Sequence, residues 1–170
     1  MAPSASCLRN RSRGRCSGAN RARENGPRAG AGRDGVADLH AAVADTHALL
    51  FHASRAAALG RRAAAHFDAC ERQQALTYVP MAVIWEVGLL ARASRVNLRR
   101  PVRDFFTDLF TNPAYHPYDL SPEQVYLADD LRFTRDPFDA LIVAAARTLD
   151  LPLISRDGDI RSSGTVSILW

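Results

Sequence analysis

Short apolar stretches alternate with amphipathic stretches along the chain from about residue 42 onward. The first apolar stretch runs to Asp45 and Thr46 and leads at once into a segment with helical spacing. Five stretches are predicted to be strands, at residues 42–46, 75–79, 115–120, 151–155 and 165–169. The stretch 115–120 is expected at a sheet edge, because Pro117 has no amide hydrogen to donate to a neighbouring strand.

The segments between these strands carry apolar residues at helical spacing. The predicted helices cover about 46–53, 54–74 with a break at Gly60, 80–94, 101–112, a segment from 121 onward, and 136–149. Ser121 and Pro122 supply an N-cap and a proline in the first helical turn. Strands that alternate with helices predict a three-layer α/β/α fold, with a central, mainly parallel sheet of four to five short strands.

Residues 1–35 differ in composition from the rest of the chain. They hold eight arginines against two acidic residues, and Leu8 is their only large aliphatic residue. Of the 22 basic and 18 acidic residues in the chain, 14 and 16 remain for residues 36–170, so the excess positive charge belongs to the amino-terminal segment. A segment this polar cannot bury enough apolar surface to offset its ordering entropy. We therefore predict disorder at 1–35 and one globular domain at 36–170.

Three interpretations of the arginine-rich segment compete. It is an arm that contacts nucleic-acid phosphates, a targeting peptide, or a stretch upstream of a true translation start near Val36. The sequence has no apolar run long enough to span a membrane. Cys7, Cys16 and Cys70 have neither metal-binding nor disulfide spacing, which favours a reducing, cytoplasmic location.

Four acidic residues occupy positions where such a sheet is expected to build a site. Asp45 and Asp157 follow predicted strands, and ligands of open α/β sheets bind beyond the carboxyl ends of the strands. Glu86 and Asp139 lie in predicted helices. Each residue also has a purely structural interpretation. These interpretations are a helix cap for Asp45, a solvent-facing position for Glu86, a capping partner for Asp139 and an Asp-Gly turn for Asp157.

The chemistry of the set depends on whether the four carboxylates meet. Carboxylates that share a cleft repel one another and raise one another's pKa values. A divalent cation removes that penalty, and all-oxygen ligands suit Mg²⁺ or Mn²⁺. Such a site activates water and neutralises charge on a phosphodiester. The five histidines lack a matching partner spacing and are expected not to be metal ligands.

Four segments of the sequence together resemble a PIN domain, and more narrowly the VapC-like toxins of bacterial toxin–antitoxin pairs. They are residues 45–50 (DTHALL), 85–87 (WEV), 135–144 (RDPFDALIVA) and 153–157 (LISRD). The resemblance extends over about residues 42–170. The segment 135–144 is specific only in combination with the first strand, since either alone is a weak signal.

The resemblance implies a function and a set of site residues. The metal-binding and catalytic acids would be Asp45, Glu86, Asp139 and Asp157. The hydroxyls of Thr46 and Ser155 would support them, and Asp136 would cap its helix or stand behind the ligands. The implied protein is a Mg²⁺- or Mn²⁺-dependent endoribonuclease of the cytoplasm that is inhibited by a cognate antitoxin and forms a homodimer.

A run of arginines beyond residue 90 is a candidate for binding the phosphates of RNA. It comprises Arg92, Arg95, Arg99, Arg100 and Arg103. A solvated helix end explains the same run equally well. Two other functions stay open. One is a PIN nuclease of RNA processing or DNA repair that has no antitoxin, and the other is an inactive nucleic-acid-binding module that uses the arginine-rich segment.

Overall fold

The structure is a computed structural model that describes residues 40–170. The segment 1–35, for which disorder and the three competing roles were predicted, lies outside the described residues. The strands of the described part are β1 (His40–Ala44), β2 (Ala75–Pro80), β3 (Tyr115–Tyr118) and β4 (Leu153–Ile154). They form one sheet in the order β3-β2-β1-β4, and every neighbouring pair is parallel. The predicted parallel sheet is therefore confirmed, with β3 at an edge.

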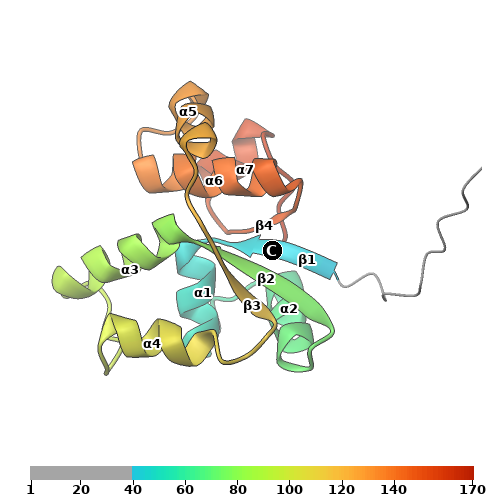
Figure 1. The fold of residues 1–170 in the computed structure, drawn as a ribbon. Coiled ribbons are helices and arrows are strands. Elements are labelled where there is room, and N and C mark those ends of the chain that lie inside the picture. The colour runs from blue at the N-terminus through green and yellow to red at the C-terminus, as the bar shows by residue number, and fades with distance from the viewer. Residues whose placement is uncertain (1–39) are drawn as a thin grey trace, which may run out of the picture. The chain divides into compact units, whose positions relative to one another are not determined.

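Helices cover both faces of this sheet. They are α1 (Thr46–Ala53), α2 (Arg61–Glu71), α3 (Met81–Arg92), α4 (Val102–Leu109), α5 (Pro122–Asp130), α6 (Pro137–Leu149) and α7 (Gly158–Ser163). Figure 1 shows α5, α6 and α7 on one side of the sheet and α1, α2 and α4 on the other. This arrangement is the predicted three-layer α/β/α fold. Within residues 40–170, no helix combines the length and the apolar character needed to cross a membrane.

The core lies where β1 is enclosed between the two helical layers. Ala42, Val43 and Ala44 are fully buried, as expected of a parallel strand that packs against helices on both faces. From α6, Ile142 and Val143 are fully buried as well. The continuous apolar character of β1 thus comes from its central place in the sheet.

Several predicted boundaries are corrected by the structure. The helix predicted at 54–74 is only Arg61–Glu71, because residues 54–59 form turns and Arg55 has a left-handed backbone (φ 52°). The strand predicted at 165–169 makes one isolated parallel bridge, between Leu153 and Ile168. Gly60 precedes α2 at a close approach of the chain, since a Cβ there would lie 2.7 Å from Trp170.

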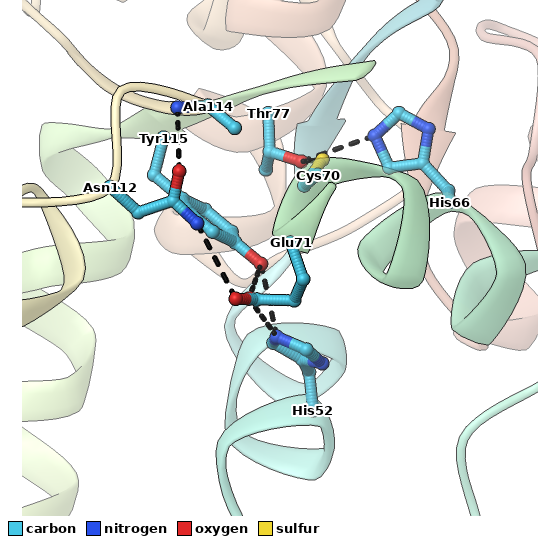
Figure 2. Close-up of polar contacts among 8 residues, drawn as sticks. All are labelled: His52, His66, Cys70, Glu71, Thr77, Asn112, Ala114 and Tyr115. Atoms are coloured by element: carbon cyan, nitrogen blue, oxygen red, sulfur yellow. Dashed lines mark hydrogen bonds and ion pairs between the residues drawn. The ribbon is translucent and has the colours of Figure 1, made fainter. Parts of the chain in front are cut away.

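One polar network ties the carboxyl ends of α1 and α2 to the start of β3 (Figure 2). The Tyr115 hydroxyl donates to Glu71 Oε1 at 2.9 Å and lies 3.0 Å from His52 Nε2. Asn112 Nδ2 donates to Glu71 Oε2 at 3.4 Å. Burial, followed by the neighbouring Glu71, raises the pKa of Tyr115 above its ordinary value. These contacts give His52 a structural place beside α2.

A second set of hydrogen-bonded side chains is buried between α2 and β2. Thr77 Oγ1 lies 3.1 Å from His66 Nε2 and 3.2 Å from Cys70 Sγ (Figure 2). Burial lowers the pKa of His66 and raises the pKa of the Cys70 thiol. Both side chains are therefore neutral members of the core.

Candidate active site

The order of the strands makes the carboxyl ends of β1 and β4 a topological switch point, and we call the region beyond these two ends the crevice. The chain leaves β1 toward β2 on one side, while β4 pairs with β1 on the other, and ligands of open α/β sheets bind at such a switch point. Asp45 directly follows β1, and its backbone amide donates to the Ile154 carbonyl at 3.1 Å. Ser155 directly follows β4. The two residues that leave these strands therefore meet at one edge of the sheet.

Asp45 is held by Ser155 within this crevice. Its side chain is only 4% exposed, and Oδ2 accepts a hydrogen bond of 2.7 Å from Ser155 Oγ. Burial raises the pKa of the Asp45 carboxyl above its ordinary value, and the bond from Ser155 partly opposes that shift. Asp45 occupies the N-cap position of α1, but its side chain makes no capping hydrogen bond. The interpretation of Asp45 as a plain helix cap is therefore wrong.

Glu86 reaches the same crevice from α3. Thr46 Oγ1, from the first residue of α1, donates to Glu86 Oε2 at 2.6 Å. Burial raises the pKa of Glu86, and the negative charge of Asp45 raises it further. Glu86 therefore lies close enough to Asp45 for their charges to interact, which excludes the interpretation that it merely faces solvent.

Asp139 approaches from the first turn of α6. Burial and, after it, the charges of Asp136, Asp45 and Asp157 together raise its pKa to about 7. Thr134 Oγ1 donates to Asp139 Oδ2 at 3.3 Å and so opposes the shift in part. Asp45 therefore lies close enough to both Glu86 and Asp139 for its charge to raise their pKa values.

Asp136 and Asp157 each cap a helix, and their charges also act on the neighbouring carboxylates. Asp136 Oδ1 accepts from the amide of Phe138 at 2.8 Å, so Asp136 caps α6 as predicted. Asp157 Oδ1 accepts from the amides of Asp159 and Ile160, at 2.8 and 2.9 Å, and caps α7. Asp157 is thus an N-cap and not an isolated Asp-Gly turn. Its charge still acts on Asp45 and Asp139.

The donor set fits a hard divalent cation by its chemistry. Asp45, Glu86 and Asp139 offer carboxylate oxygens, and Thr46 and Ser155 add hydroxyl oxygens beside them, which are the ligands that Mg²⁺ and Mn²⁺ prefer. Within residues 40–170, no three His, Cys, Asp or Glu side chains are gathered closely enough to chelate one ion directly. Mg²⁺ usually keeps several waters and is bound through one or two carboxylates, so a looser group of acids suits it.

Two features of the site were not predicted from the sequence. Thr134 links Asp139 to the start of α6, because its Oγ1 also accepts from the backbone amide of Asp136 at 3.0 Å. The only signal was a threonine two residues before a predicted cap. The second feature is His47, an exposed residue of α1 whose charge acts on both Asp45 and Glu86.

The candidate arginines separate into two groups. Arg95, Arg99 and Arg100 belong to the loop between α3 and α4, and they line a groove of about 1040 Å³ that also contacts α1. Arg92, the last residue of α3, and Arg103, in α4, do not line it. We call this feature the arginine groove.

The fold and the site together define the class of protein. It is a three-layer α/β/α domain with a parallel sheet and interacting carboxylates near the carboxyl ends of β1 and β4. The family model that describes the PIN domain matches residues 42–164, which is most of the chain. The protein therefore belongs to the PIN domain family, whose members are generally nucleases. No curated protein matches the chain in sequence.

Solved structures share the fold at low sequence identity. VapBC2 from Rickettsia felis, bound to a DNA fragment from its promoter, contains a chain that is 12% identical, with a TM-score of 0.55 over 75% of this chain and 96% of that chain. FitAcB from Neisseria gonorrhoeae is similar at 14% identity and a TM-score of 0.50, over 75% and 96%. A toxin–antitoxin complex from Klebsiella pneumoniae reaches 23% identity and a TM-score of 0.49, over 74% and 94%.

Proposed function

We propose that this protein is a Mg²⁺- or Mn²⁺-dependent endoribonuclease of the VapC-like kind. The observation that carries the proposal is the placement of buried Asp45 beyond β1, hydrogen-bonded to Ser155, with Glu86 held beside it by Thr46. Burial and the charges of Asp136, Asp45 and Asp157 also raise the pKa of Asp139 to about 7. Carboxylates kept close at such an energetic penalty are typical of sites that bind a cation. Membership of the PIN domain family supports phosphodiester hydrolysis as the reaction class.

Each residue of the crevice has a role in this proposal. The cation would be held by Asp45, Glu86, Asp139 and Asp157. When bound, it supplies charge neutralisation at the phosphodiester and a water of lowered pKa. Ser155 and Thr46 orient the carboxylates of Asp45 and Glu86 by donating hydrogen bonds to them. Asp136 caps α6 and so fixes the position of Asp139 one turn later.

The proposal includes partners. The substrate is RNA, with Arg92, Arg95, Arg99 and Arg100 as candidates for phosphate contacts. We further propose that the protein acts in the cytoplasm as a homodimer and is silenced by a cognate antitoxin. Support for the antitoxin is the resemblance of the sequence to VapC-like toxins, together with the shared fold of a chain in VapBC2.

A cleavage experiment tests the site and the reaction together. The full-length protein is incubated with a mixed RNA substrate in Mg²⁺, in Mn²⁺ and in EDTA, beside Asp45→Asn and Asp139→Asn. Asp129→Asn, at an exposed position in α5, is the matched control. We expect metal-dependent cleavage in the wild type and the control and at least roughly a hundredfold loss in both site variants. Cleavage that survives both site substitutions would refute the assignment of the site.

Two further experiments separate the proposal from its alternatives. Replacing all eight arginines of residues 1–35 by glutamine tests the inactive binding module, because cleavage retained by that variant excludes it. Expression in bacterial cells, with and without any short reading frame found next to this gene, tests the antitoxin. Growth arrest that Asp45→Asn abolishes, and that the neighbouring product relieves, fits a toxin. Arrest that no neighbouring product relieves favours a nuclease of RNA processing or DNA repair.

A further inference from the structure

The arginine groove carries an excess of positive charge. Its lining contains Arg95, Arg99, Arg100 and Arg156 against a single acidic residue, Asp108. Asp108 forms a salt bridge with Arg100. Among the described residues, Arg95, Arg99 and Arg156 take part in no salt bridge. Three guanidinium groups therefore remain to attract an anionic ligand to this groove.

Aromatic rings back two of these guanidinium groups. The Arg156 guanidinium carbon lies 4.7 Å from the ring centroid of Phe51, and that of Arg100 lies 5.4 Å from the ring centroid of Phe105. Both rings line the groove as well. A guanidinium held in this way is less free to move, which lowers the entropy lost when a ligand binds. The planar group also offers a face on which an unpaired base stacks.

The loop that carries the other arginines has a defined shape. Asn97 Oδ1 accepts from the backbone amide of Arg99 at 2.9 Å, and Arg99 itself adopts a left-handed backbone (φ 57°). A side-chain cap of this kind stabilises a tight turn. Arg95 and Arg99 are thereby presented to one groove from a structured turn.

Two residues of the groove, His47 and Arg156, lie next to the acidic residues along the chain. His47 lines the groove and lies two residues after Asp45, and its charge acts on Asp45 and Glu86. Arg156 lies between Ser155, which donates to Asp45, and Asp157. A chain that occupies the groove at these two residues is therefore close to the carboxylates.

We infer that the arginine groove binds an unpaired segment of the RNA substrate next to the scissile phosphodiester, with Arg95 and Arg99 contacting phosphates and Arg156 stacking on a base. This inference rests on the proposed ribonuclease function and adds the residues that hold the RNA next to the acidic residues. A basic groove lined by aromatic groups is the arrangement by which proteins hold single strands. In a duplex the bases are already stacked on one another and cannot use the free face of the Arg156 guanidinium.

An acidic protein segment is the competing ligand for the same charge. The guanidinium of Arg156, held over Phe51, favours RNA, since its free face can stack on a base but not on a carboxylate. The groove of about 1040 Å³ is at the upper end of ligand-site volumes, which suits more than one nucleotide.

A binding experiment separates this inference from the proposed activity. Full-length Asp45→Asn protein serves as the background, so that binding is measured without cleavage. The probe is a short fluorescent single-stranded RNA of mixed sequence, followed by anisotropy over a range of salt, beside the same RNA annealed to its complement. Arg95→Gln, Arg99→Gln and Arg156→Lys are added one at a time. Arg62→Gln, at an exposed position in α2, is the matched control.

We expect tighter binding to the single strand than to the duplex. Arg95→Gln and Arg99→Gln should each reduce the slope of log K against log salt by about 0.7. Arg156→Lys keeps the charge and should keep the slope, yet weaken single-strand binding about tenfold through lost stacking. The control should match the background. Such a pattern supports the groove even if the wild type fails to cleave the RNA chosen.

Three results would overturn the inference. The first is single-strand binding that none of the three groove substitutions changes. The second is equal weakening by Arg62→Gln, which would make the effect one of overall charge. The third is unchanged RNA binding with lost binding of a poly-glutamate peptide, which would assign the groove to an acidic protein segment. Thermal unfolding of each variant checks that the fold is retained.

Discussion

Asp139 illustrates how a single carboxylate is kept in an unfavourable setting. Its pKa near 7 means that folding moves the group away from water and toward the charges of Asp136, Asp45 and Asp157. The folded chain holds this proton more tightly than the unfolded chain does. A protonated Asp139 does not repel its neighbours, so the stability that depends on this proton is fully present below pH 3.8. It is lost as the pH rises through about 7 and the carboxyl ionises.

Asp139→Asn should therefore stabilise the metal-free protein at high pH. We expect a gain of about 1 kcal/mol in the free energy of unfolding at pH 8, and a smaller gain at pH 5, because the wild-type carboxyl is already protonated there. Urea unfolding in EDTA at the two values of pH measures the difference. An equal effect of the substitution at both would contradict the pKa assigned to Asp139.

Ser155 is a second residue whose removal has a defined consequence. It is fully buried, donates to Asp45 Oδ2, and accepts from the amide of Asp157 at 3.0 Å. Ser155→Ala should lower the free energy of unfolding by about 1–3 kcal/mol, since the buried carboxylate of Asp45 and the half-buried amide of Asp157 both lose their partner. It should also reduce metal-dependent cleavage, because Asp45 is no longer oriented. Ser162→Ala, at an exposed position of α7, should do neither.

At the scale of elements, α6 joins the core to the site. Its apolar face supplies buried residues such as Ile142 and Val143, and its first turn carries Asp139. Asp136 has two opposing effects on this helix. Its carboxylate caps the first turn, while its charge raises the pKa of Asp139.

A pair of substitutions at Asp136 separates these effects. Asp136→Asn removes the charge but keeps a side-chain oxygen that accepts from Phe138, whereas Asp136→Ala removes both. We expect Asp136→Ala to be less stable than Asp136→Asn by about 1 kcal/mol, with the pKa of Asp139 lowered in both. NMR titration of the Asp139 carboxyl together with thermal unfolding measures the two quantities. Equal stability of the two variants would show that the cap contributes nothing.

Some helices and strands could be predicted from the sequence and others could not, for physical reasons. Helix α6 was predictable because its cap, its proline at Pro137 and its apolar spacing all agree. Helix α7 was missed because it has six residues and begins at Gly158, so Asp157-Gly158 has the composition of a turn. The strand expected at 165–169 has suitable composition, but only Ile168 is positioned to bridge to the sheet.

The candidate site shows the same division. Asp45 was predictable from its place at the end of an apolar stretch, since parallel strands end at one edge. Ser155 was named only through the resemblance to the PIN domain, because it stands inside the predicted strand 151–155. The arginine groove was not, because it joins α1 to a loop some fifty residues later and to Arg156. Only the packing of α1 against the loop between α3 and α4 brings Phe51 and Arg99 to one groove.

At the scale of the whole molecule, cation binding should couple to folding. A cation that binds the folded crevice but not the unfolded chain stabilises the protein by mass action and also relieves repulsion between the carboxylates. We expect Mg²⁺ or Mn²⁺ at millimolar concentration to raise the melting temperature of the wild type by at least about 2 °C. The rise should vanish in Asp45→Asn and persist in Asp129→Asn. The same rise in Asp45→Asn would mean that the ion binds elsewhere.

Cys70 gives the molecule an internal reporter of opening. It is the only cysteine of residues 36–170, it is fully buried, and burial raises the pKa of its thiol. A thiol that is both enclosed and protonated reacts with an alkylating reagent only after α2 has separated from β2. In a full-length protein carrying Cys7→Ser and Cys16→Ser, the rate of alkylation therefore measures how often the core opens around Cys70. Added Mg²⁺ should lower the rate of alkylation if the crevice at the carboxyl end of β1 and the core between α2 and β2 open as one unit.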